Sequence, residues 1–229
     1  MYLPEFINND GNGTKLAKVI VRPRDFPVKT SFSNLQSNIW EAKEQDIFQA
    51  WKVASFIGNA RSTICKHQLQ DQAMMNHLRA EKFDIALGEY TCFYGLLEHI
   101  GIDKYITVFN TALLGGSMLG IPSTPSFVPN YVANEFPNSY LSRAKNLIST
   151  ILSDMRLYGP FLSPIENVCK DLVRPDFDIK EQIGKSAFFL VNVDEFTDFP
   201  RPISHKIVYI GGMGQAKPKP LEPDIETGF

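Results

Sequence analysis

The chain has 229 residues, of which 44% are hydrophobic and 21% charged, with a formal net charge of −2 and a pI of about 6.1. This is the composition of a globular protein with enough apolar material for a sizeable core. Lysine and arginine are scattered, without the basic run or patch by which proteins bind nucleic acid or an anionic membrane. The composition therefore excludes a nucleic-acid-binding protein and favours one large domain or two small ones.

The beginning of the chain, MYLPE, has neither the charged segment nor the apolar stretch of a secretory signal peptide. The most apolar stretch, residues 106–121, contains Asn110 and three glycines. It falls short of the roughly 20 apolar residues that span a bilayer. We therefore expect neither a signal peptide nor a transmembrane segment in this sequence. A glycosylation sequon begins at Asn12 and would be used only in the secretory pathway.

The three cysteines, Cys65, Cys92 and Cys169, lie far apart in the sequence. There is no Cys-x-x-Cys pair and no pairing of cysteine with histidine at zinc-ligand spacing, so we expect no metal site. The spacing favours three buried thiols, with one disulfide and one free thiol as the alternative.

The first part of the chain predicts a short strand followed by helices. Residues 17–21 (AKVIV) are typical of a strand that ends before Pro23. Between about residues 35 and 82, apolar side chains recur near the helical period among polar ones. This pattern predicts two helices with a break near Gly58 or Gln68.

A strand, a helix and a second strand follow at the spacing of a βαβ unit. Residues 83–88 (FDIALG) form a short apolar run that is typical of a buried parallel strand. The helix is expected through residues 94–98, closed by Gly101. The second strand is expected at residues 105–109 (YITVF).

Residues 115–137 are rich in Gly, Pro, Ser and Asn and predict a long loop, a kind of segment that usually has a function. The elements expected after it are three helices and two strands, at 139–158, 160–172 and 178–184 and at 187–191 and 207–210. Residues 213–229 are polar and Pro-rich, which predicts a linker or tail. The alternation of apolar strands with helices predicts an α/β fold with an open, mostly parallel, Rossmann-like sheet and helices on both faces.

One acidic residue, Glu89, stands directly after the predicted strand at residues 83–88. Ligands of open α/β sheets bind beyond the carboxyl ends of the strands, and a carboxylate at such a place could orient a histidine base. The alternative interpretation is a solvated loop acid. The sequence contains no GxSxG, no Walker loop and no GxGxxG after a strand. Residues 211–214 (GGMG) precede Pro-rich sequence and not the helix that a phosphate site needs, so no cofactor-binding residue is predicted.

Aromatic residues gather near the predicted strand ends and in the long loop, namely Phe93, Tyr94, Phe109, Tyr131 and Phe136. They could wall a pocket for an apolar substrate. Ordinary core packing and loop anchoring are the alternative.

Four segments, taken in order, resemble the N-terminal domain of UDP-glycosyltransferases, most of all the UDP-glucuronosyltransferases. The strand and helix at residues 83–97 are similar to a strand and helix of that family, and residues 124–129 (TPSFVP) are similar to its PSYVP loop. Residues 143–146 (RAKN) fit the helix after that loop. Residues 199–212, with FPRP followed by IVYIGG, resemble the late signature of the domain.

The resemblance covers about residues 80–212 and implies a GT-B fold. In such a fold the N-terminal domain binds a lipophilic acceptor and the C-terminal domain binds a UDP-sugar. The implied reaction is inverting transfer of glucuronate, or another hexose, to a hydroxyl group of the acceptor, with a histidine as general base. It also implies an endoplasmic reticulum location, in the membrane or lumen, and homo- or hetero-oligomers with related transferases.

The resemblance also implies roles for particular residues. Glu89 stands where the family has the aspartate that orients the catalytic histidine, with a longer reach. The residues implied to bind the acceptor are Phe93, Tyr94, Phe109 and the loop from Pro122 to Tyr131.

Two departures from the family pattern lead to further expectations. Residues 2–4 resemble the end of the family's second strand, so the first strand and the histidine belong upstream of this sequence. The UDP-sugar-binding half is expected to be missing as well, which leaves residues 1–212 as the acceptor-binding domain. The chain alone is therefore expected to bind no UDP-glucuronate or other UDP-sugar and to be inactive. The alternatives are a non-catalytic partner or regulator of full-length transferases and a small-ligand-binding α/β domain.

Overall fold

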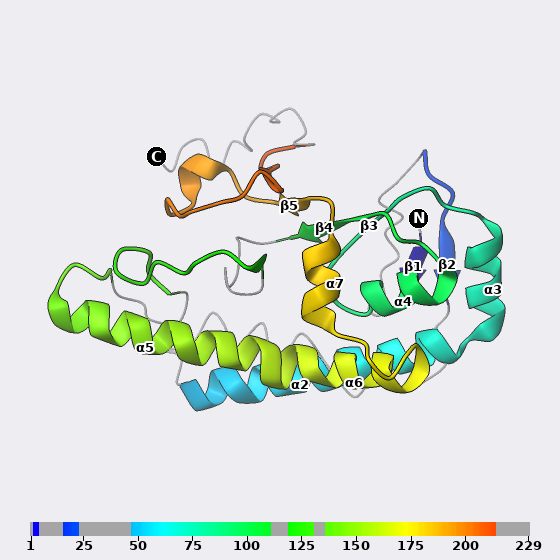
Figure 1. Cartoon of the computed structure of the whole chain (residues 1–229), viewed down its shortest axis with the longest axis horizontal. Helices are drawn as coiled ribbons and strands as arrows, with labels where there is room; N and C mark the ends of the chain where they lie inside the picture. Colours follow the sequence, from blue (N-terminus) through cyan, green and yellow to red (C-terminus); the bar gives the residue numbers. More distant parts are fainter. Residues whose placement is uncertain (1, 5–15, 23–46, 111–118, 131–135, 214–229) are drawn as a thin grey trace, which may run out of the picture.

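The computed structural model describes residues 2–4, 16–22, 47–110, 119–130 and 136–213, and the structural statements that follow concern these residues. Their centre is a four-stranded parallel sheet in the order β3-β4-β5-β6 (Figure 1). A second sheet pairs β1 and β2, also in parallel, with Leu3 opposite Val21. The strands are β1 (Tyr2–Pro4), β2 (Ile20–Arg22), β3 (Ala86–Gly88), β4 (Tyr105–Phe109), β5 (Phe189–Val191) and β6 (Ile207–Tyr209).

The helices lie mainly to one side of the four-stranded sheet. In Figure 1, α4 and α7 are next to the sheet, while α2, α5 and α6 run beyond them. The described helices are α2 (Ile47–Gln70), α3 (Gln72–Ala80), α4 (Phe93–Ile100), α5 (Tyr140–Arg156), α6 (Ser163–Leu172) and α7 (Ile179–Lys185), with a π-helical turn η2 (Leu157–Leu162) and a 3-10 turn η3 (Glu195–Thr197). The predicted α/β class with an open parallel sheet is confirmed.

The βαβ unit forms in the predicted order, but β3 is shorter than the strand expected at 83–88 and is not buried, since Ile85 is 50% and Leu87 57% exposed. Strand β4 has the predicted bounds, and α4 ends at Gly101, whose φ of 84° lies in the left-handed region. Glycine adopts this conformation without the penalty that a Cβ brings, and its N–H can bond to the last carbonyls of the helix. Gly101 N indeed donates to Leu97 O and Glu98 O.

The two helices expected between residues 35 and 82 are α2 and α3, but the break lies at Asp71. The side chain of Asp71 accepts a 3.0 Å hydrogen bond from Met74 N and so begins α3. Gly58, a predicted break, is instead inside α2. A Cβ built on Gly58 would lie 2.2 Å from Pro160 O, so glycine permits α2 to pack directly against the backbone of η2.

The helices expected at 139–158 and 160–172 form one continuous run. Helix α5 passes into the π-helical turn η2, which contains Pro160, and then into α6. A proline inside a helix removes a backbone N–H and displaces the preceding carbonyl, and a wider turn accommodates both changes. Pro160 therefore changes the type of helix and does not end it.

One face of the four-stranded sheet is buried and the other is partly exposed. Tyr105, Thr107 and Phe109 of β4 point to the helix side and are at most 4% exposed. On the opposite side, Leu87 is 57% and Val208 39% exposed. The helices expected on the second face are not found among the described residues. Short apolar strands suggest burial on both faces, but the alternation of exposure here is that of a sheet covered on one face.

The cysteines correct another expectation. Cys65 in α2 and Cys92 at the start of α4 form a disulfide, with their Cα atoms 5.2 Å apart, while Cys169 in α6 is free and buried. The favoured prediction of three thiols is wrong, and the alternative of one disulfide and one free thiol is correct. The spacing of the cysteines in the sequence does not reveal that the turn after β3 brings Cys92 next to Cys65 of α2. Burial raises the pKa of the Cys169 thiol to about 12, so this cysteine is an unreactive core residue.

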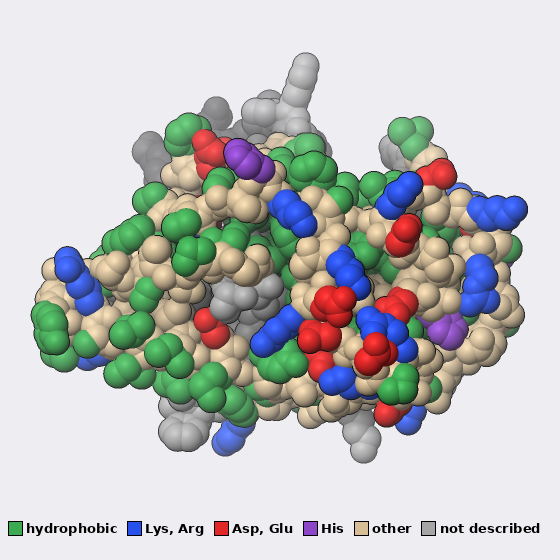
Figure 2. Space-filling view, viewed as in Figure 1, with side chains coloured by type: hydrophobic (Ala, Val, Ile, Leu, Met, Phe, Trp, Pro, Cys, Tyr) green, Lys and Arg blue, Asp and Glu red, His purple; other side chains and the backbone are tan. Residues whose placement is uncertain are grey.

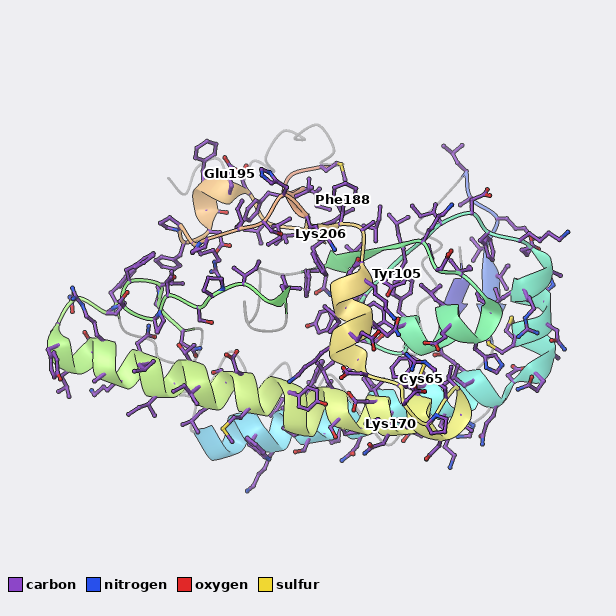
Figure 3. The ribbon with its side chains drawn as sticks, in the orientation of Figure 1. Cys65, Tyr105, Lys170, Phe188, Glu195 and Lys206 are labelled. Atoms are coloured by element: carbon purple, nitrogen blue, oxygen red, sulfur yellow. A yellow bond between two sulfur atoms is a disulfide. The ribbon has the colours of Figure 1, made fainter. Side chains whose placement is uncertain are left out.

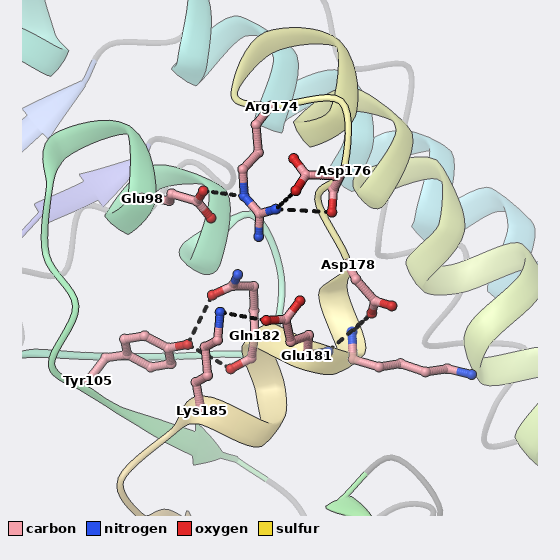
Figure 4. Close-up of polar contacts among 9 residues, drawn as sticks. Glu98, Tyr105, Arg174, Asp176, Asp178, Glu181, Gln182 and Lys185 are labelled. Atoms are coloured by element: carbon pink, nitrogen blue, oxygen red, sulfur yellow. Dashed lines mark hydrogen bonds and ion pairs between the residues drawn. The ribbon is translucent and has the colours of Figure 1, made fainter.

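Helix α7 is capped at its start and tied to the sheet through its C-terminal half. The Asp178 side chain accepts hydrogen bonds from Lys180 N and Glu181 N and caps the helix, and the Tyr105 hydroxyl donates to Gln182 O over 2.7 Å (Figure 4). Lys206, labelled in Figure 3, lies before β6 and donates to the O atom of Ser186, the residue that follows α7, over 3.0 Å. These bonds fix the crossover from α7 to β5.

None of the described helices combines the length and the apolar character needed to cross a bilayer. Residues 5–15, which include the sequon at Asn12, and residues 214–229, which make up most of the predicted tail, lie outside the described residues. The division of the chain at residue 212 stays a prediction.

Candidate functional site

Two polar side chains meet at the carboxyl edge of the sheet. Glu89 directly follows β3 and Asn110 directly follows β4, and the Asn110 Nδ2 donates a 3.0 Å hydrogen bond to Glu89 Oε1. Because β3 and β4 are parallel neighbours, their carboxyl ends lie side by side. This edge is where open α/β sheets bind ligands. Sequence reasoning singled out Glu89 and missed Asn110, although its position directly after β4 was a signal that could have found it.

The turn that carries Glu89 is held by a close contact between Gly88 and Phe93. A Cβ on Gly88 would lie 2.5 Å from the Phe93 ring, so only glycine leaves room for the ring there. Phe93, in the first turn of α4, also meets the edge of the Tyr105 ring, with the centroids 6.0 Å apart. The half-buried Phe93 therefore lies against Gly88, the residue before Glu89.

Tyr90 places an aromatic ring next to Glu89. Its centroid is 4.9 Å from that of Phe109 and 6.2 Å from that of Phe161. The guanidinium of Arg61 lies 5.1 Å from the Phe161 centroid on the same side. Burial raises the pKa of Tyr90, so its hydroxyl remains protonated at neutral pH. The aromatic cluster next to Glu89 thus joins Tyr90, Phe109 and Phe161 from three segments of the chain, and sequence reasoning missed Tyr90.

Tyr94 and Phe109 lie deeper than Glu89. Each is 1% exposed, and the Tyr94 hydroxyl is 2.8 Å from Thr107 Oγ1 within the core. Burial is also the main cause that raises the pKa of Tyr94. The structure therefore brings Phe93 and Tyr94 together, with ring centroids 5.6 Å apart, whereas the Phe109 ring lies against Tyr90 and Phe189, and both Tyr94 and Phe109 are core residues.

In the described part of the long loop, Leu119 belongs to a 3-10 turn, and residues 120–130 have no helix or strand, as predicted. Pro122 is exposed and Phe127 is 52% exposed. The loop is held from α5, where the Asn146 Nδ2 donates to Pro125 O over 2.7 Å and to Val128 O over 2.8 Å. Tyr131, a predicted acceptor-binding residue, lies outside the described residues.

The glycines and the FPRP motif near the end of the chain have structural roles. A Cβ on Gly211 would lie 2.2 Å from Asp194 N, so this glycine allows two backbone segments to touch. Arg201 of the FPRP motif forms an ion pair with Asp198 over 2.9 Å, and the Tyr209 hydroxyl donates to the same carboxylate over 3.3 Å. These contacts fix the turn between β5 and β6 at the same edge of the sheet.

Among the described residues, none of the four histidines forms a hydrogen bond with Glu89. His77 lies 3.7 Å from Glu81 in α3, and His205 is exposed in the turn before β6. His99 is in α4, where its Nε2 is buried and has no hydrogen-bond partner among the described residues. The interactions of Glu89 are with Asn110, which can orient a carboxylate but cannot act as a base.

These features define a parallel α/β domain with a positioned carboxylate and neighbouring aromatic rings at the carboxyl edge of its sheet. The family described as UDP-glucoronosyl and UDP-glucosyl transferase matches residues 6–229. The chain therefore belongs to this family, whose members have the GT-B fold. No solved structure matches the chain significantly.

Curated relatives match the chain over part of their own length. UDP-glucuronosyltransferase 2C1 of Oryctolagus cuniculus is 27% identical over 169 residues, which cover 71% of this chain and 34% of the relative. UDP-glucuronosyltransferase 3A1 of Xenopus laevis is 27% identical over 71% of this chain and 32% of the relative. UDP-glucuronosyltransferase 1A1 of Mus musculus is 24% identical over 89% of this chain and 40% of the relative. The chain thus spans roughly a third of the length of these relatives, and it matches their N-terminal region.

Proposed function

We propose that the chain is the acceptor-binding domain of a UDP-glycosyltransferase. The complete enzyme would transfer glucuronate, or another hexose, from a UDP-sugar to a hydroxyl group of a lipophilic small molecule, with inversion at the anomeric carbon. The observation that carries the proposal is the Glu89 carboxylate, held by Asn110 over 3.0 Å at the carboxyl edge of the sheet. Membership of the family over residues 6–229 supports it.

In this proposal Glu89 orients the general base. One of its oxygens accepts the hydrogen bond from Asn110, and the other can accept one from an imidazole N–H. A carboxylate in that position fixes the tautomer and orientation of a histidine and stabilises its protonated form. The histidine would take the proton from the acceptor hydroxyl, and the four histidines of this chain are not assigned that role.

The acceptor would lie on the aromatic surface next to Glu89. Phe93, Pro122 and Tyr131 would form its wall, and Tyr94 and Phe109 would support that wall from below. An apolar surface with a few positioned polar groups is the usual construction of a site for a lipophilic small molecule. The donor, UDP-glucuronate or another UDP-sugar, would bind to a different domain and not to this chain.

We further propose that the protein works in the endoplasmic reticulum, at its membrane or in its lumen. The disulfide between Cys65 and Cys92 supports an oxidising compartment, because disulfides persist there and are rare in the cytosol.

A second function, as a non-catalytic partner of full-length transferases, is favoured by the outer face of α5. This face exposes apolar side chains, with Leu141 65% and Ile148 58% exposed. Exposed apolar faces of this kind are often contacted by a partner protein. Co-purification with a complete transferase, lost on Ile148→Lys, would support this role over the catalytic one.

The transferase proposal is tested in a chimera that joins this chain to the remainder of the mouse 1A1 relative, which it matches over 221 residues. Glu89→Gln should lower kcat by about a hundredfold, the scale of positioned acid–base catalysis, and leave UDP-glucuronate binding unchanged. The exposed Glu195→Gln is the matched control and should retain full turnover. Equal turnover of Glu89→Gln and Glu195→Gln would reject the role of Glu89.

A further inference from the structure

Helix α5 is oriented with its polar side inward. The side chains on its outward face are large and apolar, and Leu141, Leu147, Ile148, Ile151 and Met155 are each 48% to 65% exposed. Figure 2 shows such side chains gathered along the edge of the molecule where α5 runs. On the inward side, Ser142 is 7% and Asn146 0% exposed. A surface helix normally buries its apolar face, whereas the inward face of α5 makes polar contacts instead of adding to the apolar core.

The inward face of α5 holds the long loop. Asn146 binds three backbone groups of the loop: its Nδ2 donates to Pro125 O and Val128 O, and its Oδ1 accepts a 2.7 Å hydrogen bond from Asn130 N. About two helical turns further along α5, Ser153 Oγ donates to Asn130 Oδ1 over 3.0 Å. The loop from residue 125 to residue 130 is therefore attached to α5 by side chains at two levels of the helix.

An asparagine is required for this arrangement. A carboxamide supplies two donors and an acceptor on one short, planar group, and both donors and the acceptor of Asn146 are used here. Aspartate has no donor for the two carbonyl oxygens, and leucine has no polar atom. A fully buried amide is tolerated only when its hydrogen bonds are made, so the loop must keep this shape for Asn146 to stay buried.

We propose that Asn146 is the positioning residue of the acceptor loop. By fixing the carbonyls of Pro125 and Val128 it sets the path of residues 122–130, which carry the exposed Pro122 and Phe127. The loop shape then decides which lipophilic acceptors fit between these residues and the aromatic surface next to Glu89. This inference rests on the proposed function, since it assigns Asn146 to acceptor selection.

The positioning itself is tested by hydrogen exchange of the unliganded chain. Asn146→Leu, of similar size, should speed exchange of the Asn130 amide by about tenfold or more, the effect expected from losing one buried hydrogen bond. Thr150→Val is the matched control, because the Thr150 hydroxyl donates only to the α5 backbone, at Asn146 O. If Asn146→Leu does not fold, Ser153→Ala removes the other attachment of Asn130 and should show a smaller acceleration. Unchanged exchange in the folded variants would overturn the inference.

Acceptor selection is tested with two fluorescence-quenching titrations, one with the flat phenol umbelliferone and one with the bulkier steroid estradiol. Asn146→Asp keeps the bond to Asn130 N but loses the two donors, and we expect the ratio of the two Kd values to change by at least about fivefold. Thr150→Val should leave the ratio unchanged. An unchanged ratio in Asn146→Asp, with faster loop exchange, would reduce Asn146 to a purely structural residue. If the unaltered chain binds neither compound, the proposed function fails, whereas the exchange experiment still decides whether Asn146 positions the loop.

Discussion

Asn110 donates a 3.0 Å hydrogen bond to the carboxylate of Glu89, and the two residues follow neighbouring parallel strands of the sheet. The bond occupies one carboxylate oxygen and restricts the rotation of the side chain. A glutamate has one more rotatable bond than an aspartate, so a fixed partner matters more for it. Asn110 therefore gives the longer acid a defined orientation at the edge where the acceptor is proposed to bind.

The first prediction concerns this hydrogen bond. In the chimera with the mouse relative, Asn110→Leu should lower kcat about three- to tenfold, less than Glu89→Gln, because the carboxylate remains but loses its orienting partner. The acceptor KM should change little. Steady-state kinetics measure both quantities, and a loss in Asn110→Leu as large as that in Glu89→Gln would contradict a purely orienting role.

Part of the candidate site could be predicted from the sequence and part could not. Glu89 and the strand before it were predicted from two signals. A short apolar run indicates a strand, and ligands of open α/β sheets bind beyond the carboxyl ends of the strands. Asn110 and Asn146 were not, because their significance depends on which strands are neighbours and on the path of a loop. The depth of Tyr94 and Phe109, each 1% exposed, likewise follows from packing between α4 and the sheet.

The second prediction concerns the disulfide between Cys65 and Cys92. It closes a loop of 27 residues, so its loss should lower the free energy of unfolding by roughly 3–4 kcal/mol. For a domain of this size that corresponds to a Tm about 6–16 °C lower. Thermal unfolding of Cys65→Ser/Cys92→Ser with and without dithiothreitol measures the effect. The reductant should lower the Tm of the unaltered protein only. An equal change in the Tm of both proteins would show that the disulfide does not stabilise the fold.

The third prediction sets two helical glycines against each other. Helix propensity alone favours alanine over glycine at both Gly58 and Gly184. A Cβ at Gly58 would meet Pro160 O at 2.2 Å, so Gly58→Ala should destabilise the protein by about 1–3 kcal/mol. A Cβ at Gly184 meets nothing within 4 Å, so Gly184→Ala should stabilise it by about 0.5–1 kcal/mol. Urea unfolding measures both, and effects of the same sign would show that α2 does not pack against η2 in this way.

The same comparison explains what the sequence could not reveal about the helices. The period of apolar residues predicted α2 and α3 but placed their break near Gly58 or Gln68, since glycine is read as a helix breaker when nothing is known of its neighbours. In the fold, Gly58 is needed for the approach of η2, and the break falls at Asp71, which caps α3. The strand β4 and the glycine cap of α4 were predicted correctly because both depend on local sequence alone.

The fourth prediction concerns pH. Burial, with the nearby carboxylates of Glu98 and Glu181, raises the pKa of Tyr105 to about 12. The unfolded value is about 10, so the folded protein holds this proton more tightly. The contribution of the protonated Tyr105 hydroxyl to the free energy of unfolding is fully present below pH 10 and is lost as the pH rises through 12. Tyr105→Phe lacks this titration, so the stability difference between the two proteins should narrow between pH 10 and pH 12.

Urea unfolding at pH 8 and at pH 11 measures that difference. At pH 8, Tyr105→Phe should be less stable by about 1 kcal/mol, because Gln182 O loses its 2.7 Å hydrogen bond from the hydroxyl. The other groups that titrate in this range are present in both proteins and cancel. A difference that stays constant with pH would show that the Tyr105 hydroxyl is not held in a buried hydrogen bond.

The central claim, that this chain binds the acceptor and not the donor, is tested most directly by isothermal titration calorimetry of the 229-residue chain with two ligands. We expect umbelliferone to bind saturably at one site, with weaker binding when Phe93 or Phe127 is replaced by alanine. We expect UDP-glucuronate to give no saturable heat. Tight, saturable binding of UDP-glucuronate, or the absence of any binding of the phenol, would contradict the account.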